Sequence, residues 1–330
     1  MSLILGIETS CDETAAAVVE DGKTVISNVI SSQIDVHREY GGVVPEIASR
    51  KHLESISFIV KEALGEIDLS KIDGIAVSNG PGLAGALLVG LSFAKSLAFA
   101  TKKPLYGVHH IYSHICANYL EREDWQPPFV CLVVSGGHTH LIHVKDYSDC
   151  EVVGRTRDDA AGEAFDKVGR TLGLPYPGGP EIDKAAKLGD PASIPFPRTS
   201  FENSLDFSFS GLKSAVLQYK QKRDIMEYSE ISNVAASFQE AVIDVLVSRS
   251  LSLCDALDLP KLAIAGGVAA NLGLRNRIAA ECRKKNIDFN LPSMVYCTDN
   301  AAMVAGAGFY RHLQNAPDNY DLNAFPTIEI

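Results

Sequence analysis

The chain has 330 residues, of which 46% are hydrophobic and 22% are charged, a composition typical of a soluble globular protein with room for two domains. Its formal net charge of −11 argues against a protein that binds nucleic acid across a wide basic surface, because phosphate contacts need clustered Lys and Arg. Two short basic clusters, at residues 220–223 and 283–285, are more typical of solvated helix faces.

The first thirty residues predict three consecutive strands. The apolar stretch LILGIE (3–8) is typical of a buried strand, a polar loop follows, and TAAAVVE (14–20) forms the return strand. Asp21-Gly22 predicts a tight hairpin turn before a third strand, KTVISNVI.

Residues 73–100 predict an apolar strand, a glycine turn and a long helix, followed by HHIYSHICA at 109–117. In this segment His110 and His114 are four residues apart and share one face of a helix, whereas His109 projects off that face. The pair supplies two ligands, and a metal site needs three or four. No His-Glu-x-x-His motif is present, so a zinc protease would lack its general base.

Residues 129–155 repeat the plan of a hairpin plus one strand. The loop Ser135-Gly136-Gly137-His138 falls at the tip of the first of these strands. Because glycine has no Cβ, such a loop lets a phosphate or carboxylate approach the main chain. His138 and His140 alternate along the returning strand, with His143 on its other face.

Residues 158–186 predict a helix from about Ala160 to Leu172, a Pro/Gly turn and a second helix from Pro180. Asp166 lies in the middle of the first helix, and Gly178-Gly179 come just before Asp183. Carboxylates beside a glycine turn suit the binding of hydroxyl or amino groups, although each Asp alone is more typical of a surface helix.

Residues 261–285 repeat the order strand, glycine turn and helix. Here Gly266-Gly267 precede Asn271 at a helix start, which suits the sugar or base of a nucleotide. Neither glycine loop matches the dinucleotide or P-loop fingerprints. The repeated order predicts two α/β halves facing each other across a nucleotide cleft, with two unrelated α/β domains as the alternative.

Asp299, in CTDNAAMVAGAG (297–308), is the expected third metal ligand. It is predicted to end a strand-like stretch and to cap a helix of small residues, so an N-cap is its alternative role. Two histidines and one carboxylate would leave coordination positions open for substrate. The remaining His37, His52 and His312 stand in polar surroundings and are expected at the surface.

The cysteines and the apolar segments indicate a cytoplasmic protein without a membrane anchor. The seven cysteines contain no Cys-x-x-Cys pair and are expected to be reduced thiols. No apolar run is free of polar or glycine breaks over a length that spans a bilayer, and no signal-like N-terminus is present.

Seven motifs together resemble the catalytic subunit family of bacterial tRNA N6-adenosine threonylcarbamoyltransferases, formerly described as O-sialoglycoprotein endopeptidases. The motifs occur in order along almost the entire chain: GIETSCDET (6–14), VHHIYSH (108–114), LVVSGGHTHL (132–141), DDAAGEAFDKVGR (158–170), YPGGPEID (176–183), GGVAAN (266–271) and CTDNAAM (297–303). The resemblance implies an α/β fold of two duplicated ribonuclease-H-like halves, as in actin, sugar kinases and Hsp70. We expect one half at 1–107 joined by 304–330, and the other at 108–303 with the metal and adenylate sites.

The resemblance also implies an activity and its residues. The family transfers a threonylcarbamoyl group from threonylcarbamoyl-AMP to N6 of adenosine 37 in tRNAs that read codons beginning with A. One divalent metal is expected, iron(II) first and zinc(II) as the alternative, and ATP or AMP would bind in the same cleft as the donor. The residues that match the family's metal ligands are His110, His114 and Asp299. The residues that match its adenylate-binding set are Val133, Val134, Ser135, Gly136, Gly137, Asp166, Gly179, Asp183 and Asn271.

The resemblance further implies partners: tRNA, a paralogous non-catalytic subunit, a small ATPase and an adenylate-forming enzyme that supplies the donor. No nucleophile is assigned, because no Ser-His-Asp or Cys-His arrangement is evident. The alternatives are an ATPase or small-molecule kinase of the same fold, and a nucleotide-binding regulatory scaffold. Glu8 stands where kinases of this fold carry an Asp, which argues against simple phosphoryl transfer.

Overall fold

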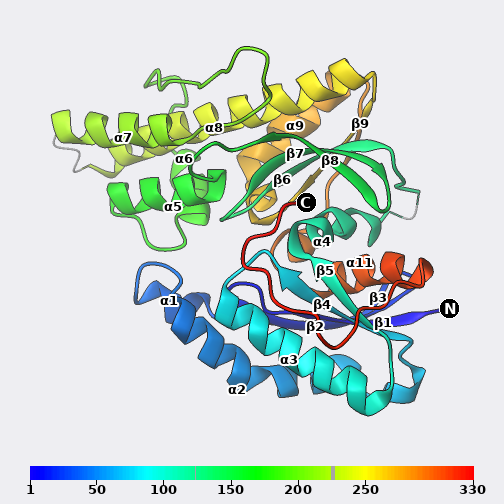
Figure 1. Ribbon diagram of the computed structural model, residues 1–330. Coiled ribbons are helices and arrows are strands. Elements are labelled where there is room, and N and C mark those ends of the chain that lie inside the picture. Colours follow the sequence, from blue (N-terminus) through cyan, green and yellow to red (C-terminus); the bar gives the residue numbers. More distant parts are fainter. Residues whose placement is uncertain (123, 224–226) are drawn as a thin grey trace. The chain divides into compact units, whose positions relative to one another are not determined.

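The computed structural model describes residues 1–122, 124–223 and 227–330, which form two compact units (Figure 1). The first unit comprises Met1–Gln126 and Pro292–Ile330, and the second comprises Pro127–Leu291. Each unit contains one five-stranded sheet.

The sheet of the first unit has the strand order β3-β2-β1-β4-β5. Its strands are β1 (Leu3–Glu8), β2 (Glu13–Glu20), β3 (Thr24–Ser32), β4 (Gly74–Gly80) and β5 (Leu105–His109). The first three strands are antiparallel, and β4 and β5 continue the sheet in parallel with β1. Asp21 and Gly22 both have positive φ, at 49° and 68°, and form the predicted hairpin turn between β2 and β3.

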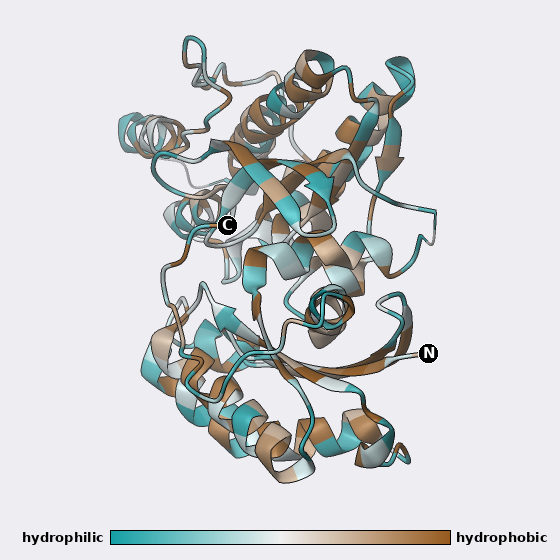
Figure 2. Cartoon of the chain, turned by 45° about the vertical axis from the view of Figure 1, so that its right-hand side comes forward, coloured by the Kyte–Doolittle hydropathy of each residue, from teal (hydrophilic) through white to brown (hydrophobic). Residues whose placement is uncertain are grey.

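Helices cover both faces of this sheet. The helices described in this unit are α1 (Ile34–Arg38), α2 (Pro45–Leu64), η1 (Leu69–Lys71), α3 (Ala84–Thr101), α4 (His110–Cys116), η2 (Ala117–Tyr119), α10 (Met294–Cys297) and α11 (Ala301–Leu313). In Figure 1, α2 and α3 lie on one face and α11 lies on the other. Figure 2 shows brown, hydrophobic segments along the strands and alternating brown and teal along the helices, as expected for helices with one buried face.

Small residues allow α11 to approach the sheet closely. A Cβ added to Gly6 of β1 would overlap the carbonyl oxygen of Ala301 and the backbone nitrogen of Ala305, so only glycine fits there. On the other side α11 packs against α4, where Gly306 faces Cys116. The small-residue sequence of α11 therefore fixes its N-terminus beside both β1 and α4.

The sheet of the second unit has the strand order β10-β9-β6-β7-β8. Its strands are β6 (Phe129–Val134), β7 (Thr139–Asp146), β8 (Asp149–Arg155), β9 (Lys261–Ala265) and β10 (Asp288–Asn290). Its helices are α5 (Ala161–Leu172), α6 (Gly178–Ala186), α7 (Ser210–Lys222), α8 (Tyr228–Leu257), η3 (Gly267–Ala270) and α9 (Leu272–Lys284). The long helix α8 packs on β6 and β9, with α9 beside it.

The two sheets confirm the duplication expected from element order. In each unit a hairpin and a third antiparallel strand are followed by two strands parallel to the first one. The chain therefore has the mixed α/β architecture of two duplicated ribonuclease-H-like halves.

The boundaries of the compact units differ from the expected division at residues 107/108 and 303/304. The first unit extends to Gln126 and resumes at Pro292, so it includes α4 and the start of α11. The reason is that α4 packs on α11, and α11 packs on β1, β4 and β5 of the first sheet. All three expected metal ligands consequently belong to the first unit, and the expected adenylate-binding residues belong to the second.

Within the described residues, α3 is a helix long and apolar enough to cross a membrane by length and composition alone. The sequence of α3 is interrupted by Gly90 and Lys95. The side of α3 that carries Leu87, Leu91 and Ala94 is buried in the core of the first unit. A core helix of a folded domain has the same composition as such a span.

Candidate metal centre and adenylate-binding residues

The two histidines of the predicted pair lie on α4, which begins directly after β5. His110 and His114 are both buried, and their rings meet edge to face with centroids 4.7 Å apart. His109 is the N-cap of α4: its Nδ1 accepts a hydrogen bond from the Ile111 N–H at 3.2 Å. The imidazole of His109 is thus engaged at the helix start, as expected for a residue off the shared face.

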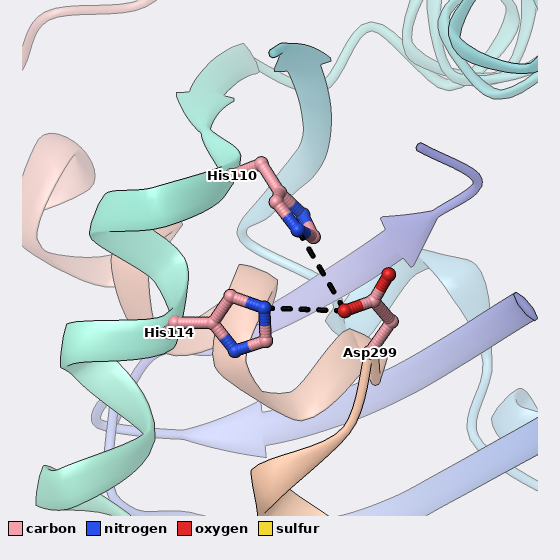
Figure 3. A group of neighbouring side chains, drawn as sticks. All are labelled: His110, His114 and Asp299. Atoms are coloured by element: carbon pink, nitrogen blue, oxygen red, sulfur yellow. Dashed lines mark hydrogen bonds and ion pairs between the residues drawn. The ribbon is translucent and has the colours of Figure 1, made fainter. Parts of the chain in front are cut away.

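Asp299 comes from the segment between α10 and α11, nearly two hundred residues away in sequence. Its Oδ1 lies 3.1 Å from His114 Nε2 and 3.6 Å from His110 Nε2 (Figure 3). One potential ligand atom from each of the three side chains lies within 4.8 Å of the others. The geometry brings together the three residues that the sequence singled out.

Two local expectations about Asp299 were wrong. The stretch before it is the short helix α10 rather than a strand. The N-cap of α11 is Asn300, whose side chain accepts a hydrogen bond from the Met303 N–H at 3.0 Å. Asn300 therefore provides the helix cap, and the Asp299 carboxylate contacts the histidines instead.

A buried network that sequence reasoning missed holds His110. Glu8, at the end of β1, is fully buried, and its Oε2 lies 3.1 Å from His110 Nδ1. Ser78 at β4 donates its hydroxyl to the same oxygen, and the Ser10 N–H donates to Glu8 Oε1. The sequence signal that could have revealed this contact is Glu8 itself, a single acidic residue at the end of an otherwise apolar strand.

The charges around His110 shift its ionisation in the metal-free chain. Burial opposes protonation of the imidazole, but the carboxylates of Asp299 and Glu8 overcome it and raise the pKa of His110 to about 9. Burial also opposes ionisation of Glu8, yet the adjacent His110 keeps the pKa of Glu8 below its ordinary value. The pair therefore behaves as a buried carboxylate–imidazolium couple.

The loop after β1 adds further acidic groups. Burial together with the negative charges of Asp12 and Asp299 raises the pKa of Glu13 well above its ordinary value. The same influences raise the pKa of the Cys11 thiol well above its ordinary value. A thiol held protonated in this way is a poor nucleophile.

The expectation that His37 and His52 lie at the surface was wrong, because both are fully buried. On α2, His52 continues the buried stripe formed by Ala48, Ile56 and Val60, a spacing that could have revealed its position. The ring nitrogens of His52 lie 2.8 Å from Thr14 Oγ1 and 2.9 Å from the Cys11 carbonyl oxygen. His52 therefore supports the acidic loop structurally.

In the second unit, the loop after β6 is open as expected. A Cβ placed on Gly136 or Gly137 would meet no atom within 4 Å. The loop is closed by a hydrogen bond from the Ser135 N–H to the His138 carbonyl, at 2.8 Å. It rests on the first turn of α5, where a Cβ on Gly162 would lie 2.6 Å from the Ser135 carbonyl oxygen.

The second glycine loop lies beside the first one, because β6 and β9 are parallel neighbours and both loops follow their carboxyl ends. Gly266 has a φ of 90° and packs directly against the backbone of Val134. Val133 and Val134 are fully buried in β6, so a ligand beside these strands would meet their main chain.

Asn271 lies at a helix start of the second unit, and the two aspartates lie on its helices. Asn271 caps α9 by accepting from the Leu274 N–H at 2.9 Å, and its amide donates to Gln239. Asp166 accepts from the Gly178 N–H at 2.7 Å, which ties α5 to the first residue of α6. Asp183 follows on α6, 3.4 Å from Lys187 Nζ, and Gly179 lies beside Phe165.

The remaining histidines of the second unit agree with the alternation expected from sequence. The rings of His138 and His140 stack with centroids 5.6 Å apart. Burial and the nearby Arg155 lower the pKa of His140. All seven cysteines are free thiols, as expected.

Comparisons with known proteins identify the family of this chain. The family model of TsaD, tRNA N6-adenosine threonylcarbamoyltransferase, matches residues 24–306. A protein named tRNA N6-adenosine threonylcarbamoyltransferase from Clostridium botulinum (strain Kyoto / Type A2) is 55% identical over 99% of this chain and 97% of its own length. One from Clostridium novyi (strain NT) is 54% identical with the same coverage.

Solved structures with little sequence similarity share the fold. HypF from T. kodakarensis aligns with a TM-score of 0.64 at 14% identity, over 97% of this chain and 49% of that chain. Component A of the Acidaminococcus fermentans (R)-2-hydroxyglutaryl-CoA dehydratase aligns with a TM-score of 0.55 at 14% identity, over 96% of this chain and all of that chain. Given its match to the family model and to these relatives, the chain belongs to the TsaD family of tRNA N6-adenosine threonylcarbamoyltransferases.

Proposed function

We propose that this chain transfers the threonylcarbamoyl group from threonylcarbamoyl-AMP to N6 of adenosine 37 in tRNAs that read codons beginning with A. Membership of the TsaD family supports the reaction class. The observation that carries the proposal is the convergence of His110, His114 and Asp299 on one point. The glycine loops of the second unit are the proposed contacts of the adenylate.

The donor set fits one divalent metal ion. Two imidazole nitrogens and one carboxylate oxygen converge within 4.8 Å, and Asn300 relieves Asp299 of the helix cap. Two histidines and one carboxylate are typical of open iron(II) sites, and zinc(II) is the alternative. When bound, the ion would supply Lewis-acid polarisation of a carbonyl oxygen or hold the threonyl oxygens.

The protein groups around the adenylate would act by binding and orientation. The backbone at Gly136 and Gly137 is open to a phosphate, which needs N–H donors and no Cβ in the way. Asp166, Asp183 and Asn271 offer oxygens and an amide to the hydroxyl and amino groups of the nucleoside.

Direct attack by the adenosine amine needs no covalent enzyme intermediate. AMP is a good leaving group, so positioning and charge stabilisation can carry the transfer. The raised pKa of the Cys11 thiol supports this direct route, since the thiolate would be scarce at neutral pH.

We further propose that the chain works in the cytoplasm with accessory proteins. These are an enzyme that makes the adenylate donor, a paralogous non-catalytic subunit and a small ATPase. A net charge of −11 supports a need for partners in tRNA binding, because phosphate contact requires basic surface.

The experiment is mass analysis of nucleosides from tRNA incubated with the protein, threonine, bicarbonate, ATP and the accessory proteins. We expect threonylcarbamoyladenosine to form only when this chain is present. Steady ATP hydrolysis or phosphorylation of a small molecule, with no modified nucleoside, would instead favour a kinase or ATPase of the same fold.

A further inference from the structure

Glu8 makes an unusual set of contacts for a strand residue in a protein core. It is 0% exposed, and none of its contacts is to Lys or Arg among the hydrogen bonds and ion pairs of the described residues. Oε1 accepts from the Ser10 N–H at 2.5 Å, and Oε2 accepts from the Ser78 hydroxyl at 2.5 Å. The remaining partner is His110 Nδ1, at 3.1 Å from Oε2.

These partners determine which ring nitrogen of His110 carries a proton. An ionised carboxylate accepts hydrogen bonds and donates none, so the short contact requires an N–H at Nδ1. The Ser10 hydroxyl lies 3.2 Å from the same nitrogen. With the proton fixed at Nδ1, the lone pair of a neutral ring belongs to Nε2, the nitrogen that faces Asp299 at 3.6 Å.

We propose that Glu8 is the positioning residue of the metal centre: it fixes the tautomer and ring orientation of His110 so that Nε2 is presented as a ligand. This inference rests on the proposed metal site. A ligand histidine that donates its second ring N–H to a carboxylate is held in orientation and made more basic by that contact.

The other histidine of the pair differs in this respect. His114 Nδ1 is buried and has no hydrogen-bond partner in the part of the chain that the structure describes. Of the two histidines, His110 is therefore the one whose Nδ1 contacts a carboxylate. Glu8 reaches it because β1, β4 and β5 are parallel neighbours that bring Glu8, Ser78 and the start of α4 to one edge of the sheet.

The test compares Glu8→Gln, Glu8→Ala and a control, Thr14→Ala, by competition of each metal-free protein with a chelator for Co²⁺. Thr14 is also buried and polar but contacts His52 instead of His110. We expect Co²⁺ affinity to fall about 10-fold in Glu8→Gln, which keeps an acceptor oxygen, and about 100-fold in Glu8→Ala. The visible absorption of bound Co²⁺ should change in both variants, and Thr14→Ala should match the parent protein.

The outcomes separate this inference from the proposed function. Parent protein that binds no Co²⁺ would overturn the metal site itself. Parent-like affinity and spectrum in a folded Glu8→Gln protein would overturn the role of Glu8 alone. If Glu8→Ala does not fold by circular dichroism, the nearly isosteric Glu8→Gln protein decides the question.

Discussion

The ionisation of His110 depends on folding, because burial brings it beside the carboxylates of Asp299 and Glu8. Its folded pKa of about 9 exceeds the ordinary value of 6.5 that we take for the unfolded chain. The charged imidazole therefore stabilises the metal-free fold, fully below about pH 6.5, and this contribution is lost as the pH rises through about 9.

We accordingly expect the free energy of unfolding of the metal-free protein to decrease between about pH 6.5 and pH 9. The His110→Asn protein should lack the part of this decrease that comes from the loss of charge on His110. Urea unfolding at a series of pH values, with chelator present, measures the free energy of unfolding of both proteins. Equal pH slopes for the two would contradict the assigned charge on His110.

The spacing of residues along the chain predicted the pairing of His110 with His114 but not the contact of His110 with Glu8. The separation of His110 and His114 by four residues predicted their shared face, because a helix imposes that period locally. Glu8 was not predicted to contact them, since its partners are 70 and 102 residues away and meet it only through the pairing of β1, β4 and β5.

Among the elements, the approach of α11 to β1 determines where Asp299 lies. A methyl group at Gly6 would overlap the α11 backbone. We expect Gly6→Ala to destabilise the protein by about 1–3 kcal/mol and to weaken metal binding by displacing Asp299. Denaturant unfolding and Co²⁺ competition measure these effects. Gly211→Ala, where an added Cβ meets nothing within 4 Å, should change neither.

The loop between β6 and β7 is the proposed binding site of the adenylate phosphate, and a substitution at Gly136 tests it. Space around Gly136 is open, so Gly136→Val should fold normally, while its side chain would block a phosphate from the backbone. We expect calorimetric titration to show loss of AMP and ATP binding. Gly211→Val, on α7, is the matched control, because an added Cβ there also meets nothing within 4 Å. Unchanged affinity in a folded Gly136→Val protein would refute the proposed adenylate site.

Element order was predictable because strand and helix periods, glycine turns and the Asp21-Gly22 hairpin are local signals. The structure confirms α5, which begins at Ala161, and the repeated strand-turn-helix segments. The segment before Asp299 was predicted as a strand but forms α10, where four residues are too few for periodicity to distinguish the two. The unit boundaries depend on α4 packing against α11, a long-range contact that no local pattern encodes.

At the scale of the whole molecule, the acidic chain is expected to be insufficient by itself. We predict no modified nucleoside when the purified protein receives tRNA, threonine, bicarbonate and ATP with nothing else. Nucleoside mass analysis with each accessory protein omitted in turn measures this requirement. Full modification by the chain alone would contradict the proposed dependence on partners.

The central claim is that His110, His114 and Asp299 hold the metal needed for transfer. The most direct measurement is the metal-to-protein ratio of His110→Ala, His114→Ala, Asp299→Ala and His109→Asn proteins, each assayed in parallel for transfer to tRNA. Asn at position 109 can still cap α4, so this variant removes the imidazole while keeping the helix start. We predict that the first three proteins lose both metal and transfer with unchanged far-UV circular dichroism, and that His109→Asn keeps both. Full metal content in His114→Ala, or metal loss only in His109→Asn, would contradict the account.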